Sequence, residues 1–204
     1  SKMYDRKVSN LVLVCFLGLF VFMAIGVDAA PKPVEITGLK VADKSPYKIG
    51  KDLKKGVKYY IDRDYTVVEM PADMVGIQWI MTGNSQKGSK GAVFVTFTVD
   101  RPSIIWIGYD SRGNEAKKGV PPAWLTKDYK MAAGTIKVTD GNMDTFNLWK
   151  RSVPAGKVEI PGNAEAPAKG FGSNYIVLVE AGLNTAVSPK TKLSTTWSRI
   201  KSVK

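Results

Sequence analysis

The sequence predicts an all-β protein: an antiparallel β-sandwich, jelly-roll-like or Ig-like, preceded by one N-terminal transmembrane helix. From Lys58 onward, short runs rich in Val, Ile, Thr and aromatic residues alternate with clusters of Gly, Pro, Asn and Asp, which is the pattern of strands and turns. Beyond position 30, no window of about eleven residues shows the 3.6-residue period of an amphipathic helix. By contrast, residues 11–27 contain no charged side chain, which indicates a membrane segment.

The uncharged segment 11–27 has the properties of a membrane anchor. As a helix it would be about 26 Å long, the lower limit for crossing a bilayer core. Three cations and one acid precede it in residues 1–10, so the positive-inside rule places the N-terminus in the cytoplasm and the main domain in the periplasm or otherwise outside the cell membrane. The alternative is a signal peptide cleaved after residues 27–29, which match the small-residue cleavage pattern loosely. We favour an uncleaved signal anchor in the inner membrane.

Composition divides the chain into five parts. We expect a cytoplasmic flank at 1–10, the anchor at 11–27, a linker rich in Lys and Pro at 28–56, the β-sandwich at 57–182 and a basic C-terminal tail at 183–204. The tail contributes five basic residues and no acid to the net charge of +12. Lysines of the linker either contact anionic headgroups or keep the linker solvated.

Within the sandwich we expect eight or nine short strands. Residues 92–99 (AVFVTFTV) alternate, with the apolar side chains from Val93 to Val99 on one face, as in a half-buried antiparallel strand. Residues 103–109 are apolar on both faces, which predicts a central strand, and the link at 100–102 between the two predicts a tight hairpin turn. The predicted strands lie near 58–61, 65–70, 76–82, 92–99, 103–109, 135–139, 145–150, 157–160 and 174–180.

Composition also excludes several kinds of chemistry. The 204 residues include no histidine and one cysteine, Cys15, which excludes Ser-His-Asp and Cys-His catalysis, histidine-ligated metal or haem, and an intramolecular disulfide. The sequence has no Walker, G-x-G-x-x-G or C-x-x-C motif. We therefore expect no enzyme, no cofactor and no metal site. Nucleic acid is not an expected partner, because the positive charge is concentrated in the linker and the tail.

Two acidic stretches each have two interpretations. Asp62 and Asp64 would point the same way in an extended chain, as a glycosidase-like pair requires, but they are better explained by binding to Arg63 or to backbone amides in a turn. Residues 140–144 (DGNMD) are similar to a calcium loop, yet Arg151 stands where an EF-hand needs a bidentate acid. A β-turn rich in Asn and Gly explains this second stretch better.

Aromatic residues are the main candidates for a binding surface. They either form a platform on which sugar rings stack or pack the core, with Trp124 plugging one end of the sandwich. We favour packing, because Pro121 and Pro122 are suited to hold such a plug. The aromatic residues in question are Trp106, Tyr109, Trp124, Tyr129 and Trp149. The candidate ligand or partner surface comprises Asp110, Arg112, Trp124, Tyr129 and Trp197.

Five segments have the order and spacing of a known module: YYIDRDYTVVEMPADMVGIQWIMTGN (59–84), FTVDRPSIIWIGYDSR (97–112), PAWL (122–125), FNLWKRSVPAGKVEIPGN (146–163) and NYIVLVE (174–180). On these segments the chain resembles a β-sandwich accessory module of secreted bacterial proteins, often found beside polysaccharide lyases. The resemblance implies a sandwich, export and a role in attachment, and it implies no catalytic residue. The chain departs from the module where Pro-Gly-Asn replaces the double glycine that often precedes the asparagine.

The sequence favours a non-catalytic accessory or structural subunit of a larger membrane protein complex, docking through its extracytoplasmic sandwich. A bioenergetic assembly such as a photosynthetic reaction centre is one candidate, although no residue indicates pigment or haem ligation. The alternative is a membrane-anchored carbohydrate-binding module. The expected partners are the lipid bilayer, other subunits of the complex and, for the alternative, polysaccharide.

Overall fold

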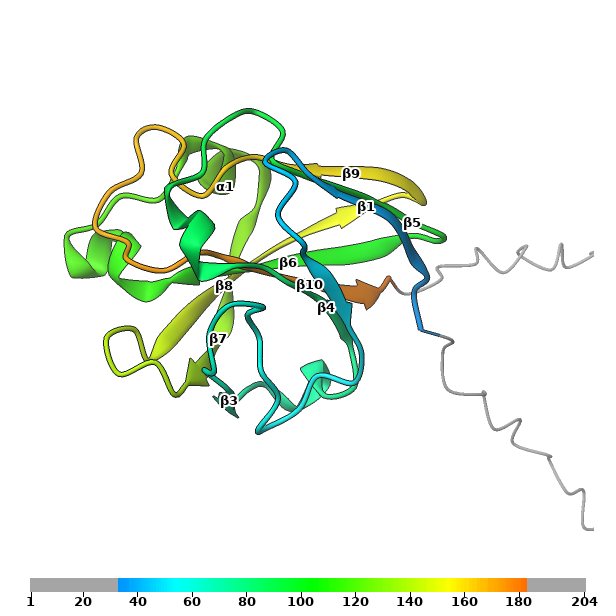
Figure 1. Cartoon of the computed structure of the whole chain (residues 1–204), viewed down its shortest axis with the longest axis horizontal. Helices are drawn as coiled ribbons and strands as arrows, with labels where there is room; N and C mark the ends of the chain where they lie inside the picture. The colour runs from blue at the N-terminus through cyan, green and yellow to red at the C-terminus, as the bar shows by residue number, and fades with distance from the viewer. Residues whose placement is uncertain (1–32, 183–204) are drawn as a thin grey trace, which may run out of the picture. The chain divides into compact units, whose positions relative to one another are not determined.

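The computed structural model describes residues 33–182 (Figure 1). The predicted cytoplasmic flank, the membrane anchor and the basic tail with Trp197 lie outside the described residues. Within residues 33–182, no helix has the length and apolar character needed to cross a bilayer.

The described domain is built almost entirely of strands. In chain order they are β1 (Ile36–Val41), β2 (Lys48–Gly50), β3 (Val67–Glu69), β4 (Gln78–Met81), β5 (Val95–Val99), β6 (Ser103–Asp110), β7 (Lys130–Val138), β8 (Thr145–Val153), β9 (Gly156–Ile160) and β10 (Ile176–Ala181). The helices of residues 33–182 are the α-helix α1 (Ala123–Asp128) and the short 3₁₀ helices η1 (Ala72–Met74), η2 (Asn84–Gly88), η3 (Ser111–Gly113) and η4 (Glu115–Lys117).

These strands form two antiparallel sheets (Figure 1). The small sheet has the order β1-β5-β9, and the large sheet has the order β2-β4-β10-β6-β8-β7-β3. The predicted all-β fold is therefore confirmed. Strand β6 lies fourth among the seven strands of the large sheet, which confirms the central position predicted from its apolar residues.

Two apolar clusters form the core. One lies between the sheets and includes Phe97 of β5 and Ile107 of β6. The other covers the opposite face of the large sheet, where Tyr59 and Met74, from the chain before β4, pack with Phe146 of β8. The central strands β6 and β10 of the large sheet are thus covered on both faces, and this explains why they are apolar on both sides.

Strand β5 shows the predicted alternation over its own length. Val95, Phe97 and Val99 are buried, and the two threonines between them are more exposed. Val93 precedes the strand and is 43% exposed. The alternating segment therefore begins later than the sequence predicted.

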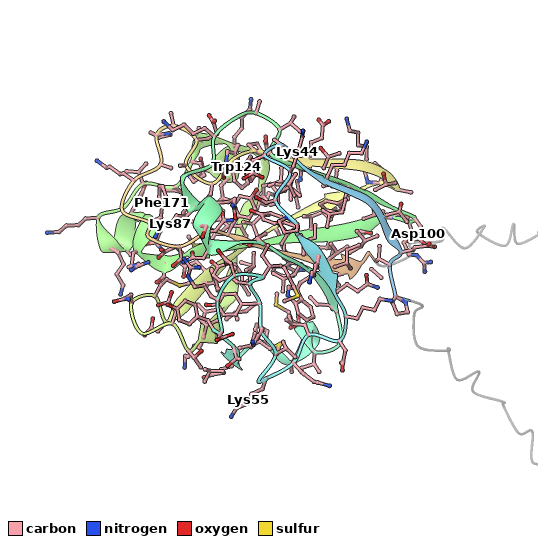
Figure 2. The ribbon with its side chains drawn as sticks, in the orientation of Figure 1. Lys44, Lys55, Lys87, Asp100, Trp124 and Phe171 are labelled. Atoms are coloured by element: carbon pink, nitrogen blue, oxygen red, sulfur yellow. The ribbon has the colours of Figure 1, made fainter. Side chains whose placement is uncertain are left out.

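The hairpin predicted at 100–102 is wrong. Strand β5 belongs to the small sheet and β6 to the large one, so this link carries the chain between the layers. The two ends of the link bind different segments. At the first end, Asp100 exchanges hydrogen bonds with Glu35, just before β1. Gly182, just after β10, donates from its backbone N to the Pro102 carbonyl at 2.9 Å. Figure 2 shows Asp100 at the tip where the chain changes sheets.

The described part of the expected linker contributes two strands that were not anticipated. Strand β1 pairs with β5, and β2 pairs with β4. The register of β1 shifts between Thr37 and Lys40, and Ile36 is its one fully buried residue, so the sequence there has little periodicity. Conversely, residues 58–61, predicted as a strand, make only isolated bridges.

Candidate functional site

Asp110 and Arg112, predicted together as ligand-binding residues, form an ion pair at the end of β6. The Arg112 guanidinium donates from Nη2 to Asp110 Oδ2 at 2.7 Å and from Nε to Oδ1 at 3.0 Å. The backbone amides of Gly172 and Ser173 also donate to this carboxylate, at 2.7 and 2.9 Å. Asp110 is completely buried. Its hydrogen bond raises the pKa of Arg112. Because the carboxylate already accepts hydrogen bonds from the guanidinium and from the two amides, it has little capacity left for a ligand.

The turn at 140–144 packs against the same ion pair. Asp140 accepts a hydrogen bond from the Asn142 amide at 3.0 Å, which is an Asx turn. Arg112 donates to the Asn142 carbonyl at 2.7 Å. Within residues 33–182, no three His, Cys, Asp or Glu side chains lie close enough together to hold a metal ion. The Asx turn and the contact with Arg112 support the β-turn interpretation of this stretch.

Trp124 and Tyr129, the other described candidates, form a separate buried pair. Their rings contact each other edge to face, with centroids 5.7 Å apart, and Trp124 Nε1 donates to the Gly162 carbonyl at 3.1 Å. Trp124 belongs to the core cluster between the sheets, and Figure 2 labels its position. Among the described residues, no hydrogen bond, ion pair or ring contact joins this pair to Asp110 or Arg112.

The five aromatic residues considered for a sugar platform are at most 9% exposed. Their rings therefore pack in the core and do not offer a surface on which sugar rings could stack. The five residues are Trp106, Tyr109, Trp124, Tyr129 and Trp149.

Asp62 and Asp64 do not act as a pair. Asp62 accepts hydrogen bonds from the backbone amides of Asn84 and Ser85, at 2.7 and 2.9 Å. Partial burial acts to raise the pKa of Asp62, but hydrogen bonds from Ser85 and Asn84 and the charge of Arg63 outweigh it, and the pKa is lowered. Asp64 instead binds the exposed Lys58 at 2.6 Å. The structure thus favours the turn interpretation over the glycosidase-like pair.

An open cavity of about 360 Å³ lies where β8, β9 and the end of α1 meet. We call it the Arg151 cavity. It is lined by Ala92, Asp128, Tyr129, Arg151, Lys157, Glu159 and Pro161. Its walls thus combine cationic donors and carboxylate acceptors around one buried aromatic residue, an arrangement suited to a polar ligand.

Arg151 is incompletely satisfied in this cavity. Its Nη2 donates to the Glu159 carbonyl at 3.1 Å, and its guanidinium lies over the Tyr129 ring, 4.7 Å from the centroid. The Nε of Arg151 and the hydroxyl of Tyr129 are both buried, and neither has an aligned hydrogen-bond partner among residues 33–182. Burial raises the pKa of Tyr129 to about 12, although the charge of Arg151 and the close approach of its side chain to the hydroxyl both act to lower it. The hydroxyl is therefore a neutral donor and acceptor at ordinary pH.

A second cavity, of about 380 Å³, shares Asp128 and Arg151 with the first. We call it the Lys150 cavity. It is lined by Ile104, Asp128, Lys130, Lys150, Arg151 and Ser152. Three of these side chains are cationic and one is acidic, and none of the three cations makes an ion pair with a described residue.

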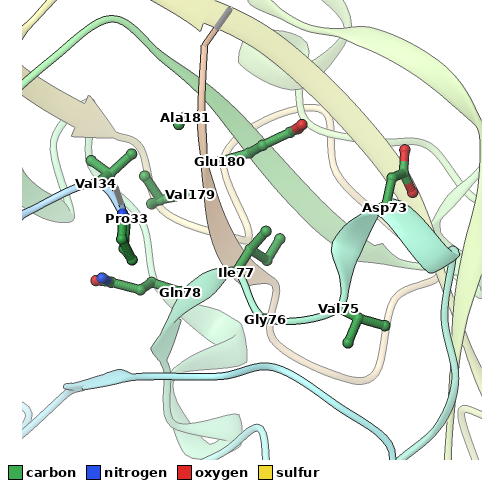
Figure 3. Close-up of a pocket in the computed structure, with 10 residues that line it drawn as sticks. All are labelled: Pro33, Val34, Asp73, Val75, Gly76, Ile77, Gln78, Val179, Glu180 and Ala181. Atoms are coloured by element: carbon green, nitrogen blue, oxygen red, sulfur yellow. The ribbon is translucent and has the colours of Figure 1, made fainter. Parts of the chain in front are cut away.

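Two other cavities are less suited to a ligand. A hollow of about 550 Å³ beside Asp62 is lined by charges that largely pair with one another, Lys58 with Asp64 and Arg63 with Asp62. The cavity in Figure 3, of about 350 Å³, lies at the end of β10. Its labelled residues are mainly small or apolar, with Asp73 and Glu180 as its acids.

Sequence reasoning missed Lys130, Lys150 and Arg151. No local motif joins them, because residue 130 reaches residues 150 and 151 only through the pairing of β7 with β8. The available signal was the doublet of cations at 150–151, directly after the apolar residues Leu148 and Trp149.

Comparisons with known proteins identify a fold and no family. No family model matches the sequence, and no curated protein matches it. A β-glucuronidase from glycoside hydrolase family 2 is 17% identical over 70% of this chain and 14% of its own, with a TM-score of 0.61. A GH138 enzyme that targets pectin rhamnogalacturonan II is 11% identical over 75% of this chain and 17% of its own, with a TM-score of 0.45. The chain therefore spans less than a fifth of either enzyme, and the first likeness shows that its β-rich fold occurs within a glycoside hydrolase.

Proposed function

We propose that the described domain is a non-catalytic carbohydrate-binding domain and that it binds sugar in the Arg151 cavity. The observation that supports this most directly is the combination of Tyr129 and Arg151, whose buried polar atoms have no aligned protein partner among the described residues. Such groups are costly when unsatisfied. A sugar hydroxyl that enters beside the guanidinium can accept a hydrogen bond from Arg151 Nε and donate one to the Tyr129 hydroxyl oxygen.

The rest of the cavity suits the same ligand. Asp128 and Glu159 supply acceptors, and Lys157 supplies a donor, around an opening that is exposed to solvent. Polar side chains that converge on a concave surface are the usual means of orienting a small polar ligand. The fold agrees with this proposal, since a glycoside hydrolase family 2 enzyme contains a similar domain, but that likeness alone concerns architecture.

A binding role is better supported than catalysis. Three of the acids considered for chemistry are engaged elsewhere: Asp62 with backbone amides, Asp64 with Lys58 and Asp110 with Arg112. Glu159, in the cavity itself, is paired with Lys157. This acid of the cavity thus already has an ion-pair partner in the free protein.

The test is retention of the full-length chain, in mild detergent, on a panel of immobilised neutral and acidic polysaccharides. Tyr129→Phe removes only the hydroxyl and is expected to weaken binding by about tenfold, the value of roughly one hydrogen bond to a ligand. Arg151→Ala should weaken it further. Lys55→Ala changes an exposed cation on the opposite side of the domain from Trp124 (Figure 2) and should bind as the unmodified protein does. A chain retained on no polysaccharide would refute the proposal.

The accessory-subunit function and the inner-membrane location remain predictions, because residues 1–27 lie outside the described residues. The described surface does not favour docking through a large apolar face. Its exposed large hydrophobic residues come from four different segments: Val68, Val75, Val93 and Met131. Isolated exposed hydrophobic residues are ordinary on soluble surfaces. Purification of the native protein at fixed stoichiometry with other subunits would support the accessory role.

A further inference from the structure

We infer that the ligand is an acidic polysaccharide, and that the Lys150 cavity binds a carboxylate or sulfate group of the chain whose neighbouring sugar occupies the Arg151 cavity. This inference rests on the proposed function and adds the chemical class of the ligand. The two cavities share Asp128 and Arg151, so one extended ligand that passes the start of β7 can contact both.

The strongest evidence is the cross-strand position of two lysines. Lys130 of β7 lies directly opposite Lys150 of β8 in the antiparallel register. Like charges in directly opposed positions repel and destabilise a sheet. Both side chains are exposed, and neither makes an ion pair with a described residue. An anionic group placed between them would remove the repulsion, so the arrangement is unfavourable in the free protein and favourable in a complex.

A neighbouring aromatic ring holds Lys150 in place without neutralising its charge. The Lys150 ammonium lies 4.9 Å from the centroid of the Trp106 ring, and Trp106 Nε1 donates to Glu180 Oε2 at 2.8 Å. Asp128 is the one acid among the described residues that line the cavity. Lys130 and Lys150 therefore face one carboxylate, Asp128, which leaves a net positive cavity. Arg151, the next residue along β8, directs its guanidinium to the other face of the strand, over the Tyr129 ring. Lysines at such a site bind carboxylate or sulfate through charge-assisted hydrogen bonds.

The experiment compares matched polymers on the full-length chain in mild detergent. Polygalacturonate carries charged carboxylates where its methyl ester carries neutral ester groups on the same backbone, and dextran sulfate and dextran provide the corresponding comparison for sulfate. We expect at least one acidic polymer to bind about tenfold more tightly than its uncharged counterpart, as for one charge-assisted hydrogen bond. This advantage should shrink as salt is raised. Tighter binding of polygalacturonate identifies carboxylate as the preferred group, and tighter binding of dextran sulfate identifies sulfate.

The variant pair Lys130→Gln and Lys150→Gln tests the site itself. Each substitution should weaken binding of the acidic polymer by about tenfold and leave binding of the neutral polymer unchanged. The melting temperature of Lys130→Gln should not fall, because the opposed like charges are removed. Lys55→Gln and Lys169→Gln lower the net charge equally at exposed positions outside both cavities and should have little effect.

The outcomes separate this inference from the proposed function. Equal binding of an acidic polymer and its neutral counterpart would overturn the inference and leave the carbohydrate-binding proposal standing. Equal losses in the cavity variants and in the control variants would also overturn it, because the effect would then be one of net charge. Binding of a DNA duplex as tight as that of the acidic polysaccharide would overturn the ligand class. No binding to any polymer would refute the proposed function as well.

Discussion

Asp110 and Arg112, two residues apart in the chain, form a bidentate ion pair in which the carboxylate is completely buried and the guanidinium side chain is 32% exposed. The same carboxylate accepts the backbone amides of Gly172 and Ser173, and Arg112 also reaches the Asn142 carbonyl. One ion pair thus joins the end of β6 to two distant loops. Its role in the described domain is to hold these segments together.

Replacing Asp110 with alanine should destabilise the fold strongly. The substitution leaves the Arg112 guanidinium and the amides of Gly172 and Ser173 without their acceptor, and the loss of one partner of a buried ion pair typically costs about 3–5 kcal/mol. Urea denaturation followed by tryptophan fluorescence measures the change. Asp64→Ala, which breaks an exposed pair with Lys58, is the control and should leave the midpoint unchanged. Equal shifts for the two variants would contradict this role of Asp110.

Tyr59 and Tyr60 are adjacent and fully buried, yet removal of their hydroxyls should have different effects. The Tyr60 hydroxyl donates to the Asn174 carbonyl, whereas the Tyr59 hydroxyl has no partner among the described residues. Tyr60→Phe should therefore lower the free energy of unfolding by about 1 kcal/mol, and Tyr59→Phe should leave it unchanged or raise it. Thermal or urea unfolding of the two variants provides the comparison. A larger loss for Tyr59→Phe would show that its hydroxyl has a partner in solution.

The sequence predicted those strands whose burial is reflected in the order of apolar and polar residues along the strand. Residues 103–109 are apolar on both faces because β6 is covered by both core clusters, and residues 95–99 alternate because β5 is covered on one face. Strand β1 was missed, since one of its six residues is fully buried. This strand is defined by its backbone pairing with β5. Backbone hydrogen bonds do not require particular side chains, so the pairing could not be predicted from the residue types.

The candidate site was harder to predict, because it depends on contacts between distant segments. The sequence analysis grouped Asp110, Arg112 and Trp124 as parts of one candidate surface. In the structure, the ion pair packs against residues 172–173, and Trp124 instead binds the Gly162 carbonyl. The cavities around Arg151 arise where β7, β8 and β9 meet. Only the strand register reveals that lysines twenty residues apart are opposed.

Acid should destabilise the protein partly through Asp62. Its pKa is below the ordinary value of 3.8, because hydrogen bonds from Ser85 and Asn84 outweigh partial burial. A carboxyl group with a lowered pKa in the folded state stabilises the fold above its ordinary pKa, and this contribution is lost as the pH falls through the folded-state value. We therefore expect Asp62→Asn to be less stable than the unmodified protein at pH 7, by about 2 kcal/mol.

The same variant should lose less stability than the unmodified protein between about pH 5 and pH 2. Urea midpoints measured across this range test the prediction. Asp73→Asn is the control, because Asp73 makes no hydrogen bond or ion pair with a described residue. Parallel stability curves for Asp62→Asn and the unmodified protein would contradict the assigned role of Asp62.

Gly119 lets the loop after η4 pass directly over the backbone that carries Arg112. A Cβ at this position would lie 2.6 Å from the Gly113 carbonyl carbon and 2.7 Å from the Gly113 Cα. Because these are backbone atoms, the clash cannot be relieved by rotation of a side chain, and Gly119→Ala should cost about 1–3 kcal/mol or more. Gly141→Ala is the matched control: a Cβ there would meet nothing within 4 Å, and the smaller backbone entropy of unfolded alanine should leave stability unchanged or slightly higher. The double variant Gly119→Ala with Asp110→Ala tests the mechanism. If the clash acts by displacing Arg112, Gly119→Ala should lower the free energy of unfolding less once Asp110 is absent. Fully additive losses of stability would show that the clash acts independently of the ion pair.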